Sequence, residues 1–370
     1  MPGQRTPSSV LLAGGGSAGH VSPLLAVADA LVRRLPAVRV SALGTAAGLE
    51  ARLVPARGYH LAFVPKVAMP RRLDGAVLRL PGALRSAVAA AGAAIDEAGA
   101  EVVVGFGGYV STPAYLAARR RSLPIVVHEQ NARAGMANRL GARLTRYVAT
   151  TFTSTNLPHG TVLGMPLRRE ISRLDRTGRR DEARAHFGLE RGFPTVLVTG
   201  GSLGAQRLNT SFAARARELS AAGIQVLHVT GEGNELTPDP RGTPVPYVVV
   251  PYVDRMDLAY AAADLVVCRS GASTVCELTA VGLPAVYVPL PIGNGEQRFN
   301  AADVVAAGGG LLVEDEALTP AWVEGELVRL AGDGARLERM GRAAASVGQR
   351  DADERLTDLV CRAFEGSGGR

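Results

Sequence analysis

A histidine that directly follows a glycine-rich turn is the first residue of the chain placed to do chemistry. The apolar run Val10–Ala13 predicts a short buried strand, and the stretch from Pro23 onward predicts a helix that opens just after His20. The positive end of a helix dipole disfavours a protonated imidazole, so a neutral His20 facing a cleft could accept a proton from a substrate hydroxyl. A histidine that only caps the helix or packs in the core remains the alternative.

The glycines of this turn also fit the pattern G-x-G-x-x-G, through Gly14, Gly16 and Gly19, which is found where dinucleotides bind. A dinucleotide fold would also place an acid at the end of its second strand to hold the ribose. The predicted second strand, Val38–Leu43, ends without one, and Glu50 comes later, inside the next predicted helix. The sequence therefore disfavours a nicotinamide enzyme.

Two further glycine turns resemble the first, GFGGYVSTP at 105–113 and TGGSLGAQRLN at 199–209. Each follows a predicted strand and opens a predicted helix. Glycine lets the backbone approach a ligand closely, and the start of a helix offers free N–H groups to an anion. Three such turns favour a phosphate or sugar ligand over glycines that only make tight turns.

The second half of the chain holds a denser cluster, CRSGASTVCELTAVGLPAVYVPLP at 268–291. A helix that begins near Ala272 would direct its first amides at an anion. Glu277 lies one turn further on the face of Ser273, where a carboxylate can accept from two ribose hydroxyls. The following loop, IGNGEQRFNA, carries amides suited to sugar hydroxyls. An exposed helical glutamate and a solvated loop remain the alternatives.

Predicted strands and helices alternate along the whole chain, which is typical of parallel α/β sheets. After the first strand, the clearer strands are Val38–Leu43, Glu101–Gly105, Ile125–His128, Thr195–Thr199, Val226–Val229, Tyr247–Val250, Leu265–Cys268 and Ala285–Val288. A break near Gly164–Arg168 precedes a charged stretch, Arg173–Arg184, and the pattern then restarts. We expect two Rossmann-like domains, 1–164 and 165–345. The remainder, 346–370, would be a C-terminal helix able to pack back on the first domain, with a disordered tail from Gly366.

Composition narrows the classes of protein. A chain of 370 residues with 47% hydrophobic content can fill two cores. Its three cysteines form neither a metal-ligand spacing nor a disulfide framework, which fits a reducing cytosol. No signal peptide and no span of about 20 apolar residues is evident, so we expect a soluble chain. The net charge of +7 suits an anionic membrane or a phosphorylated substrate. Nucleic acid is disfavoured, because aromatic stacking residues and a reading helix are missing.

These motifs together resemble the MurG family of N-acetylglucosaminyltransferases over nearly the whole chain. The resemblance rests on GGGSAGH, LGTAAGLEARLVPARGY, GFGGYVSTP, HEQNARAGMANRL, GMPLR, GGSLGAQRLN, RSGASTVCELTAVGLPAVYVPLP and GNGEQRFNA. They occur in the family's order and spacing. The sequence departs from the family's usual residues at Ala18, Thr112, Leu203 and Glu296, which bears on donor selectivity and acceptor fit.

The resemblance implies a GT-B fold, with two Rossmann-like domains whose parallel sheets face a cleft. It also implies inverting transfer of GlcNAc from UDP-GlcNAc to the 4-hydroxyl of the MurNAc-pentapeptide of lipid I, which forms lipid II in peptidoglycan synthesis. Another GT-B UDP-sugar enzyme with a different acceptor, an epimerase among them, is one alternative. A non-catalytic UDP-sugar-binding protein is the other.

Residues carry over from the family motif by motif. His20 is the expected catalytic base and Glu129 the second choice, with Tyr109, Glu129 and Asn131 on the acceptor side. The implied donor contacts are Ser17, Ala18, Gly19, Asn131, Arg168, Ser202, Val253, Ala272, Ser273, Thr274, Val275, Cys276, Glu277 and Gln297. Val253 would meet uracil through its backbone. We expect no metal or other cofactor, because Asp351 and Asp353 match an Asp-x-Asp pair only in a charged terminal helix.

The lipid tail of the acceptor raises the question of the membrane. Residues 66–90 mix Lys66, Arg71, Arg72, Arg79 and Arg85 with aliphatic side chains, which suits an interfacial patch on anionic lipid. An amphipathic helix packed on the sheet is the alternative. With the family in view, we expect peripheral attachment to the anionic inner leaflet, at the cytoplasmic face of the bacterial cell membrane. Other cell-wall synthesis proteins are candidate partners.

Overall fold

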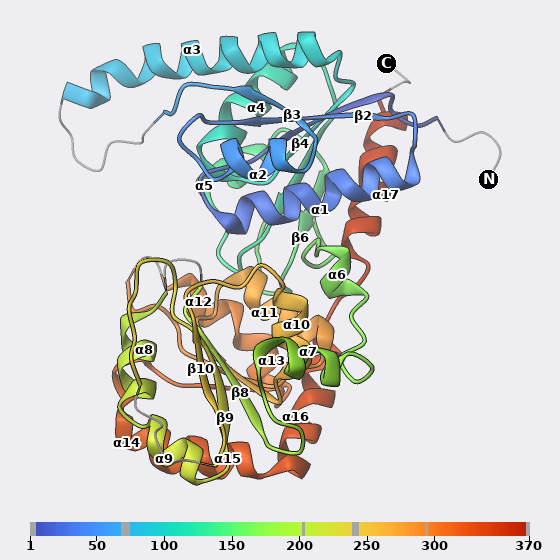
Figure 1. Ribbon diagram of the computed structural model, residues 1–370. Helices are drawn as coiled ribbons and strands as arrows, with labels where there is room; N and C mark the ends of the chain where they lie inside the picture. The colour runs from blue at the N-terminus through green and yellow to red at the C-terminus, as the bar shows by residue number, and fades with distance from the viewer. Residues whose placement is uncertain (1–4, 68–74, 202–203, 239–243, 293–294, 368–370) are drawn as a thin grey trace. The chain divides into compact units, whose positions relative to one another are not determined.

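The computed structural model describes residues 5–67, 75–201, 204–238, 244–292 and 295–367. The chain divides into two compact units (Figure 1). The first unit comprises Met1–Arg168 together with Arg350–Arg370, and the second comprises Arg169–Gln349. The C-terminal segment therefore belongs to the first unit, although it follows the second in sequence.

The first unit is built on a seven-stranded parallel sheet in the order β3-β2-β1-β4-β5-β6-β7. Its strands are β1 Ser9–Ala13, β2 Arg39–Gly44, β3 His60–Phe63, β4 Val102–Gly105, β5 Ile125–Glu129, β6 Tyr147–Thr150 and β7 Gly160–Val162. Its helices are α1 Ala18–Arg34, α2 Glu50–Ala56, α3 Gly75–Ala98, α4 Gly108–Arg120, α5 Met136–Gly141 and α17 Ala352–Glu365.

Alternate residues of β1 pack into two separate cores, because successive side chains of a strand point to opposite faces. Val10 and Leu12 join the core under α1, α2 and α17. Leu11 and Ala13 join the core under α3 and α4. Burial on both faces explains why β1 is an uninterrupted apolar run in the sequence.

The second unit repeats this plan with a six-stranded parallel sheet in the order β10-β9-β8-β11-β12-β13. Its strands are β8 Thr195–Thr199, β9 Gln225–Val229, β10 Tyr247–Val250, β11 Leu265–Cys268, β12 Ala285–Tyr287 and β13 Gly310–Leu312. Its α-helices are α6 Arg169–Ser172, α7 Arg180–Phe187, α8 Gln206–Ala213, α9 Ala216–Ala221, α10 Met256–Ala262, α11 Ala272–Val281, α12 Glu296–Asn300, α13 Ala302–Ala306, α14 Pro320–Trp322, α15 Val328–Gly332 and α16 Gly334–Val347. A 3₁₀ turn, η1 Asp315–Ala317, and a π-helical turn, η2 Val323–Leu327, complete it.

Strand order reverses direction at one point in each sheet, between β1 and β4 and between β8 and β11. In open parallel sheets, ligands bind at such a switch point, beyond the carboxyl ends of the strands. All three glycine turns leave the sheets from these ends. The fold therefore places the residues singled out in the sequence at the two edges where a ligand is expected.

The structure corrects the sequence prediction in several places. Helix α1 begins at Ala18, before His20, so the histidine lies inside the first turn. The predicted C-terminal helix of 346–370 is α17, which begins only at Ala352. The predicted disordered tail lies partly outside the described residues.

Helix α17 packs against α1. Leu356 and Val360 enter the core of the first unit, and Arg33 Nη2 lies 3.0 Å from Asp353 Oδ2. Asp353 is thus committed to an ion pair between two helices. The aspartate of this Asp-x-Asp pattern therefore serves to hold α17 against α1.

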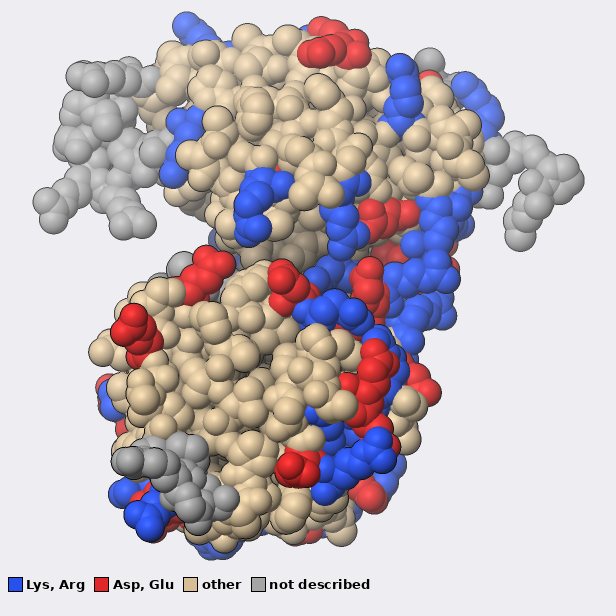
Figure 2. All heavy atoms as spheres, viewed as in Figure 1, with Lys and Arg blue, Asp and Glu red and all other residues tan. Residues whose placement is uncertain are grey.

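Charged side chains of the second unit gather, on the face shown in Figure 2, over the side where α7 and α10 lie in Figure 1. Both signs are interleaved there. Arg179 Nη1 lies 2.8 Å from Asp257 Oδ2, and Arg184 Nη2 lies 2.8 Å from Asp264 Oδ2. The excess of arginine is therefore partly matched by acids on this side. Among the described residues, no helix has both the length and the apolar character needed to cross a membrane.

Candidate active site

A pocket of about 320 Å³ opens in the first unit, at the carboxyl ends of β1 and β4. Two of the glycine turns form it together. A Cβ atom at Gly108, whose φ is +76°, would lie only 2.7 Å from the carbonyl oxygen of Gly15. Glycine is required for this close approach of two backbones. The pocket is lined by Gly15, Gly16, Ser17, His20, Thr45, Ala47, Gly48, Lys66, Gly108, Tyr109 and Val110.

His20 lies in this pocket with its imidazole half-buried. Its Nδ1 is 2.9 Å from Ser17 Oγ, the hydroxyl of the residue that precedes α1. The backbone of Gly107 packs against the other side of the ring, where a Cβ would lie 3.2 Å from Nε2. Burial lowers the pKa of His20, and a hydrogen bond to Gly15 and the charge of Glu50 oppose it in part. The imidazole is therefore neutral at pH 7, as a proton acceptor must be.

Glu50 is a functional residue that the sequence argument missed. It is fully buried, and its Oε2 accepts a hydrogen bond of 2.8 Å from the Gly16 amide. Its Oε1 accepts from the amide and the hydroxyl of Thr45, both at 2.8 Å. Burial raises the pKa of Glu50, but these N–H and O–H donors more than offset it, so its pKa lies below the ordinary value.

The carboxylate of Glu50 thus fastens the first glycine turn to the end of β2. Its oxygens are engaged by donors of the chain itself, so Glu50 does not take the role of an acid that holds a ribose. A Cβ at Gly15 would collide with it. The sequence signal was an acid at the first position of a helix directly after a Gly-Leu pair, where an acid is favoured by the helix dipole.

Glu129, the second choice for the base, lies at the end of β5 and is only 2% exposed. Its oxygens accept hydrogen bonds from the amides of Asn131 and Gly135, each 3.0 Å, and from Asn138 Nδ2 at 2.9 Å. Burial raises the pKa of Glu129, and these donors work against the rise. The carboxylate organises the loop between β5 and α5, which also carries Asn131.

Tyr109 lies in the second glycine turn and is 47% exposed. The Nζ atom of Lys66 sits 5.7 Å from the centre of its ring, within the range of a cation–π contact. Ser17, Ala18 and Gly19 occupy the start of α1 beside the same pocket. The structure therefore brings these predicted residues together with His20.

In the second unit, α11 begins at the switch point. As at any helix start, its first N–H groups have no acceptor within the helix. Gly271 precedes it in an extended conformation and accepts from the amide of Val275. The hydroxyl oxygens of Ser270 and Ser273 are buried and have no hydrogen-bond partner among the described residues. Buried polar groups are nearly always satisfied. The two hydroxyls and the first amides of α11 are therefore donors that an anion could accept from.

Glu277 is held one turn further along α11 by α10, since Tyr260 donates a hydrogen bond of 2.7 Å to its Oε2. Several other residues predicted to contact the donor can reach it mainly through their backbone groups. The side chains of Val253, Ala272 and Val275 are at least 92% buried, and burial strongly raises the pKa of the Cys276 thiol.

The remaining predicted donor residues lie on several elements. Gln297 Oε1 accepts from the amide of Leu290 at 3.0 Å, which ties α12 to the loop after β12. Arg168 is half-buried at the end of the first unit. Thr274 is half-buried at the start of α11. Ser202 lies outside the described residues. In the described part of the chain, no group of three or more His, Cys, Asp or Glu side chains could hold a metal ion.

Comparison with known proteins gives the family. Residues 10–150 match the glycosyltransferase family 28 N-terminal domain, and residues 195–356 match the glycosyltransferase family 28 C-terminal domain. A protein of Leifsonia xyli subsp. xyli is 57% identical over 95% of this chain and 98% of its own length. One from Nocardioides sp. is 56% identical over 98% of this chain and all of its own. Both are named UDP-N-acetylglucosamine–N-acetylmuramyl-(pentapeptide) pyrophosphoryl-undecaprenol N-acetylglucosamine transferase. The chain belongs to the MurG family.

Solved structures agree with this assignment. The crystal structure of Acinetobacter baumannii MurG superposes with a TM-score of 0.78 at 29% identity, covering 96% of this chain and 100% of that one. The calicheamicin glycosyltransferase CalG4 has a TM-score of 0.66 at 20% identity, covering 98% of this chain and 99% of that one, and shows the fold alone. The predicted MurG membership and GT-B fold class are confirmed.

Proposed function

We infer that the protein transfers GlcNAc from UDP-GlcNAc to lipid I, the undecaprenyl-diphospho-MurNAc-pentapeptide, and so forms lipid II for peptidoglycan. The single observation that carries this is the identity of 57% over 95% of the chain with a relative named for that reaction. The glycosyltransferase domains match both units. The lowered pKa of His20 in one unit and the unpartnered hydroxyls at α11 in the other support this proposal.

The anion site at the start of α11 suits the donor diphosphate. The helix amides, with the hydroxyls of Ser270 and Ser273, can donate to phosphate oxygens. Glu277, which accepts a hydrogen bond from Tyr260, would accept from ribose hydroxyls. Arg168 and Ser202 are proposed as further diphosphate contacts. Ser17, Ala18, Gly19, Asn131, Val253 and Gln297 complete the proposed donor set.

His20 is proposed as the base. As the 4-hydroxyl of the muramoyl sugar attacks the anomeric carbon, His20 takes the hydroxyl proton, the new C–O bond forms, and the bond to UDP breaks with inversion. UDP leaves with the electron pair, and its negative charge is stabilised by amides and Arg168. His20 is favoured over Glu129 because both carboxylate oxygens of Glu129 already accept hydrogen bonds. We further propose that no metal takes part.

The acceptor's lipid tail leads us to propose peripheral attachment at the cytoplasmic face of the cell membrane through residues 66–90. Lys66 and Arg85 are exposed, whereas Arg71 and Arg72 lie outside the described residues and the Arg79 side chain is not described. Replacement of Arg71, Arg72 and Arg79 by Glu should abolish sedimentation with phosphatidylglycerol vesicles. Unchanged sedimentation would refute the attachment.

The experiment that tests the transferase function measures UDP release from UDP-GlcNAc with and without a short-chain lipid I analogue. We expect release that depends on the acceptor, together with a disaccharide product linked through the 4-hydroxyl with inverted configuration. Donor binding without release in the presence of competent acceptor would instead indicate a binding protein. Conversion of UDP-GlcNAc without acceptor would indicate an epimerase.

A further inference from the structure

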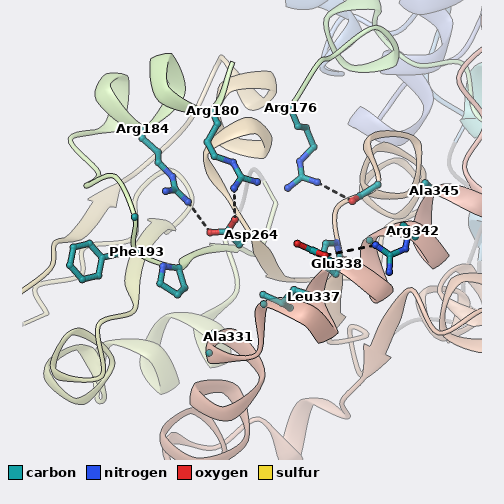
Figure 3. A pocket seen from close by; sticks show the side chains of 17 residues that line it. Arg176, Arg180, Arg184, Phe193, Asp264, Ala331, Leu337, Glu338, Arg342 and Ala345 are labelled. Carbon is teal, nitrogen blue, oxygen red and sulfur yellow. Dashed lines mark hydrogen bonds and ion pairs between the residues drawn. The ribbon is translucent and has the colours of Figure 1, made fainter. Parts of the chain in front are cut away.

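A second hollow, of about 660 Å³, lies in the second unit (Figure 3). Three of its lining residues, Pro194, Asp264 and Pro284, directly precede β8, β11 and β12. The hollow is therefore at the amino edge of the sheet, whereas the proposed donor site is at the carboxyl edge. A strand rises about 3.3 Å per residue, so the length of β8 alone separates the two edges by roughly 13 Å. We call this hollow the arginine pocket.

Four arginines line the arginine pocket, Arg176, Arg180, Arg184 and Arg342, against two acids, Asp264 and Glu338. The lining therefore carries two positive charges more than negative ones. Asp264 serves several donors at once, as Figure 3 shows in part. Its Oδ2 lies 2.8 Å from Arg184 Nη2 and 2.9 Å from the amide of Thr195, and its Oδ1 lies 3.2 Å from Arg180 Nη1.

Arg176 is a half-buried cation whose side chain donates hydrogen bonds to neutral groups. Its guanidinium donates to the carbonyls of Tyr260, Ala263 and Gly282, at 3.1, 2.7 and 2.9 Å. Burial and the neighbouring charge of Arg180 lower the pKa of Arg176 to about 10, while the charge of Asp264 opposes this in part, so the group is still charged at pH 7. Removing a charge from water is costly, and each opposite charge nearby lowers that cost. An anion in the pocket would do so.

Arg180 stands beside this charge and has donor capacity left. Its Nε is buried and has no hydrogen-bond partner among the described residues, although the side chain as a whole is 39% exposed. Across the pocket, Arg342 Nη1 is 3.9 Å from Glu338 Oε2, and both side chains are largely exposed. A long, solvent-exposed pair of this kind is weak, so Arg342 can turn to another acceptor.

The rest of the wall is apolar. Phe193, Pro194, Ala331 and Leu337 line it, and in Figure 3 Phe193, Ala331 and Leu337 lie below the row formed by Arg184, Arg180 and Arg176. Apolar walls with a few polar groups, enclosing some 300–1,000 Å³, are typical of small-molecule sites. Guanidinium groups recognise carboxylate and phosphate because their forked N–H groups match those oxygens.

We propose that the arginine pocket binds a small organic anion, with its carboxylate or phosphate between Arg180 and Arg342 and an apolar body against Phe193 and Leu337. This site is separate from the donor site and does not depend on the proposed function. It lies at the C-terminal end of α11, because the carbonyl of Gly282 that holds Arg176 directly follows that helix.

Isothermal titration with phenyl phosphate tests the proposal, on the full chain with and without UDP at saturating concentration. We expect one saturable event with a Kd of about 1 mM or tighter, and weaker binding of inorganic phosphate, which lacks the apolar body. Arg180→Gln and Arg342→Gln should each weaken phenyl phosphate binding about tenfold, the loss of one charge-assisted hydrogen bond.

Arg329→Gln is the matched control, since Arg329 is 72% exposed on α15, pairs with Glu326, and does not line the pocket. Its affinity should equal that of the unmodified chain. Arg342 is exposed, so its variant keeps the proposal testable if Arg180→Gln lowers the melting temperature. No saturable binding, equal affinity in all three variants, binding that UDP displaces, or binding no tighter than that of inorganic phosphate would each overturn the proposal.

Discussion

The two switch points have the same topology and differ in how their hydrogen bonds are completed. At the β1–β4 point, the chain's own side chains hold the turns. Glu50 accepts from Gly16, and Ser111 Oγ lies 2.8 Å from the amide of Gly107, from which it accepts. At the β8–β11 point, the hydroxyls of Ser270 and Ser273 are buried and unpartnered among the described residues. At the first point, side chains of the protein satisfy the amides of the turns. At the second point, the two hydroxyls can still donate to a ligand.

This difference matches the two roles in the proposed reaction, a base at the first switch point and diphosphate binding at the second. A base must keep one orientation and one protonation state, so the turn around His20 benefits from being rigid. A site for a diphosphate must present donors that its own chain does not use. We therefore expect changes at the first switch point to affect stability and turnover, and changes at the second to affect donor affinity.

The largest effect should come from His20→Ala. Loss of a general base lowers kcat by roughly 10²–10⁴-fold, while KM for UDP-GlcNAc stays nearly the same. Steady-state kinetics of UDP release with the lipid I analogue measure both. His60→Ala, at an exposed histidine on β3, is the matched control and should be silent. A large rise in the KM for UDP-GlcNAc with kcat unchanged would contradict the expectation that the first switch point governs turnover.

The pH profile sharpens the same prediction. Burial lowers the pKa of His20, and the neutral imidazole is the active form. Activity should therefore be full at neutral pH and fall in acid, with its midpoint below the ordinary histidine value of about 6.5. A midpoint in kcat/KM above that value would rule out a buried neutral His20 as the base.

Glu50→Gln should have the next largest effect. The amide keeps the shape but turns an NH₂ group toward an N–H of Gly16 or Thr45, which costs about 1–3 kcal/mol of the free energy of unfolding. Because the pKa of Glu50 is lowered in the folded state, its contribution is present above the ordinary pKa and is lost as pH falls through the folded value. Urea titrations at neutral and acid pH should show a gap between variant and unmodified chain that narrows in acid.

Glu97→Gln, at an exposed position on α3, is the control for Glu50 and should change stability little. We also expect the Glu50 variant to lose turnover, because the turn that carries His20 is loosened. A variant that is as stable and active as the unmodified chain would show that the first site does not depend on its carboxylate anchor.

Tyr260→Phe should have a smaller effect, limited to the donor. Without the hydroxyl, Glu277 loses one bond that orients it, and KM for UDP-GlcNAc should rise about 2- to 10-fold with kcat nearly unchanged. Tyr287→Phe is the control, because the Tyr287 hydroxyl is buried with no partner among the described residues. Equal effects of the two variants would remove Glu277 from the donor site.

The smallest expected effect is that of chelation. If amides and arginine stabilise the leaving UDP, EDTA should leave the rate of UDP release unchanged. A loss of rate that Mg²⁺ restores would show that the second site needs a metal in addition to its own donors.

The sequence predicted the central strands well because burial on both faces makes them continuous apolar runs. β8, β10 and β11 begin and end at the predicted residues. The strands β3, β6, β7 and β13 were missed. All three residues of β7 are exposed at the sheet edge, and β13 begins with a glycine, so neither carries the apolar pattern of a buried strand.

The features of the site that the sequence did not predict depend on contacts between segments far apart in the chain. Its motifs place His20 and α11 at the ends of strands, and the structure has them there. That Glu50 folds back on Gly16, 34 residues earlier, depends on the pairing of β1 with β2. Glu129 accepts hydrogen bonds from Asn131, Gly135 and Asn138 because of the path that the following loop takes.

Helix α17 has a consequence for how the chain is made. The second unit is one continuous segment, Arg169–Gln349, whereas the first unit requires Arg350–Arg370 from the end of the chain. During synthesis, the second unit can fold as soon as it has emerged. The first unit, although translated first, must wait for Leu356 and Val360 to cover its core. A chain that ends before α17 would therefore keep a complete second unit and an incomplete first one, with apolar surface of α1 exposed.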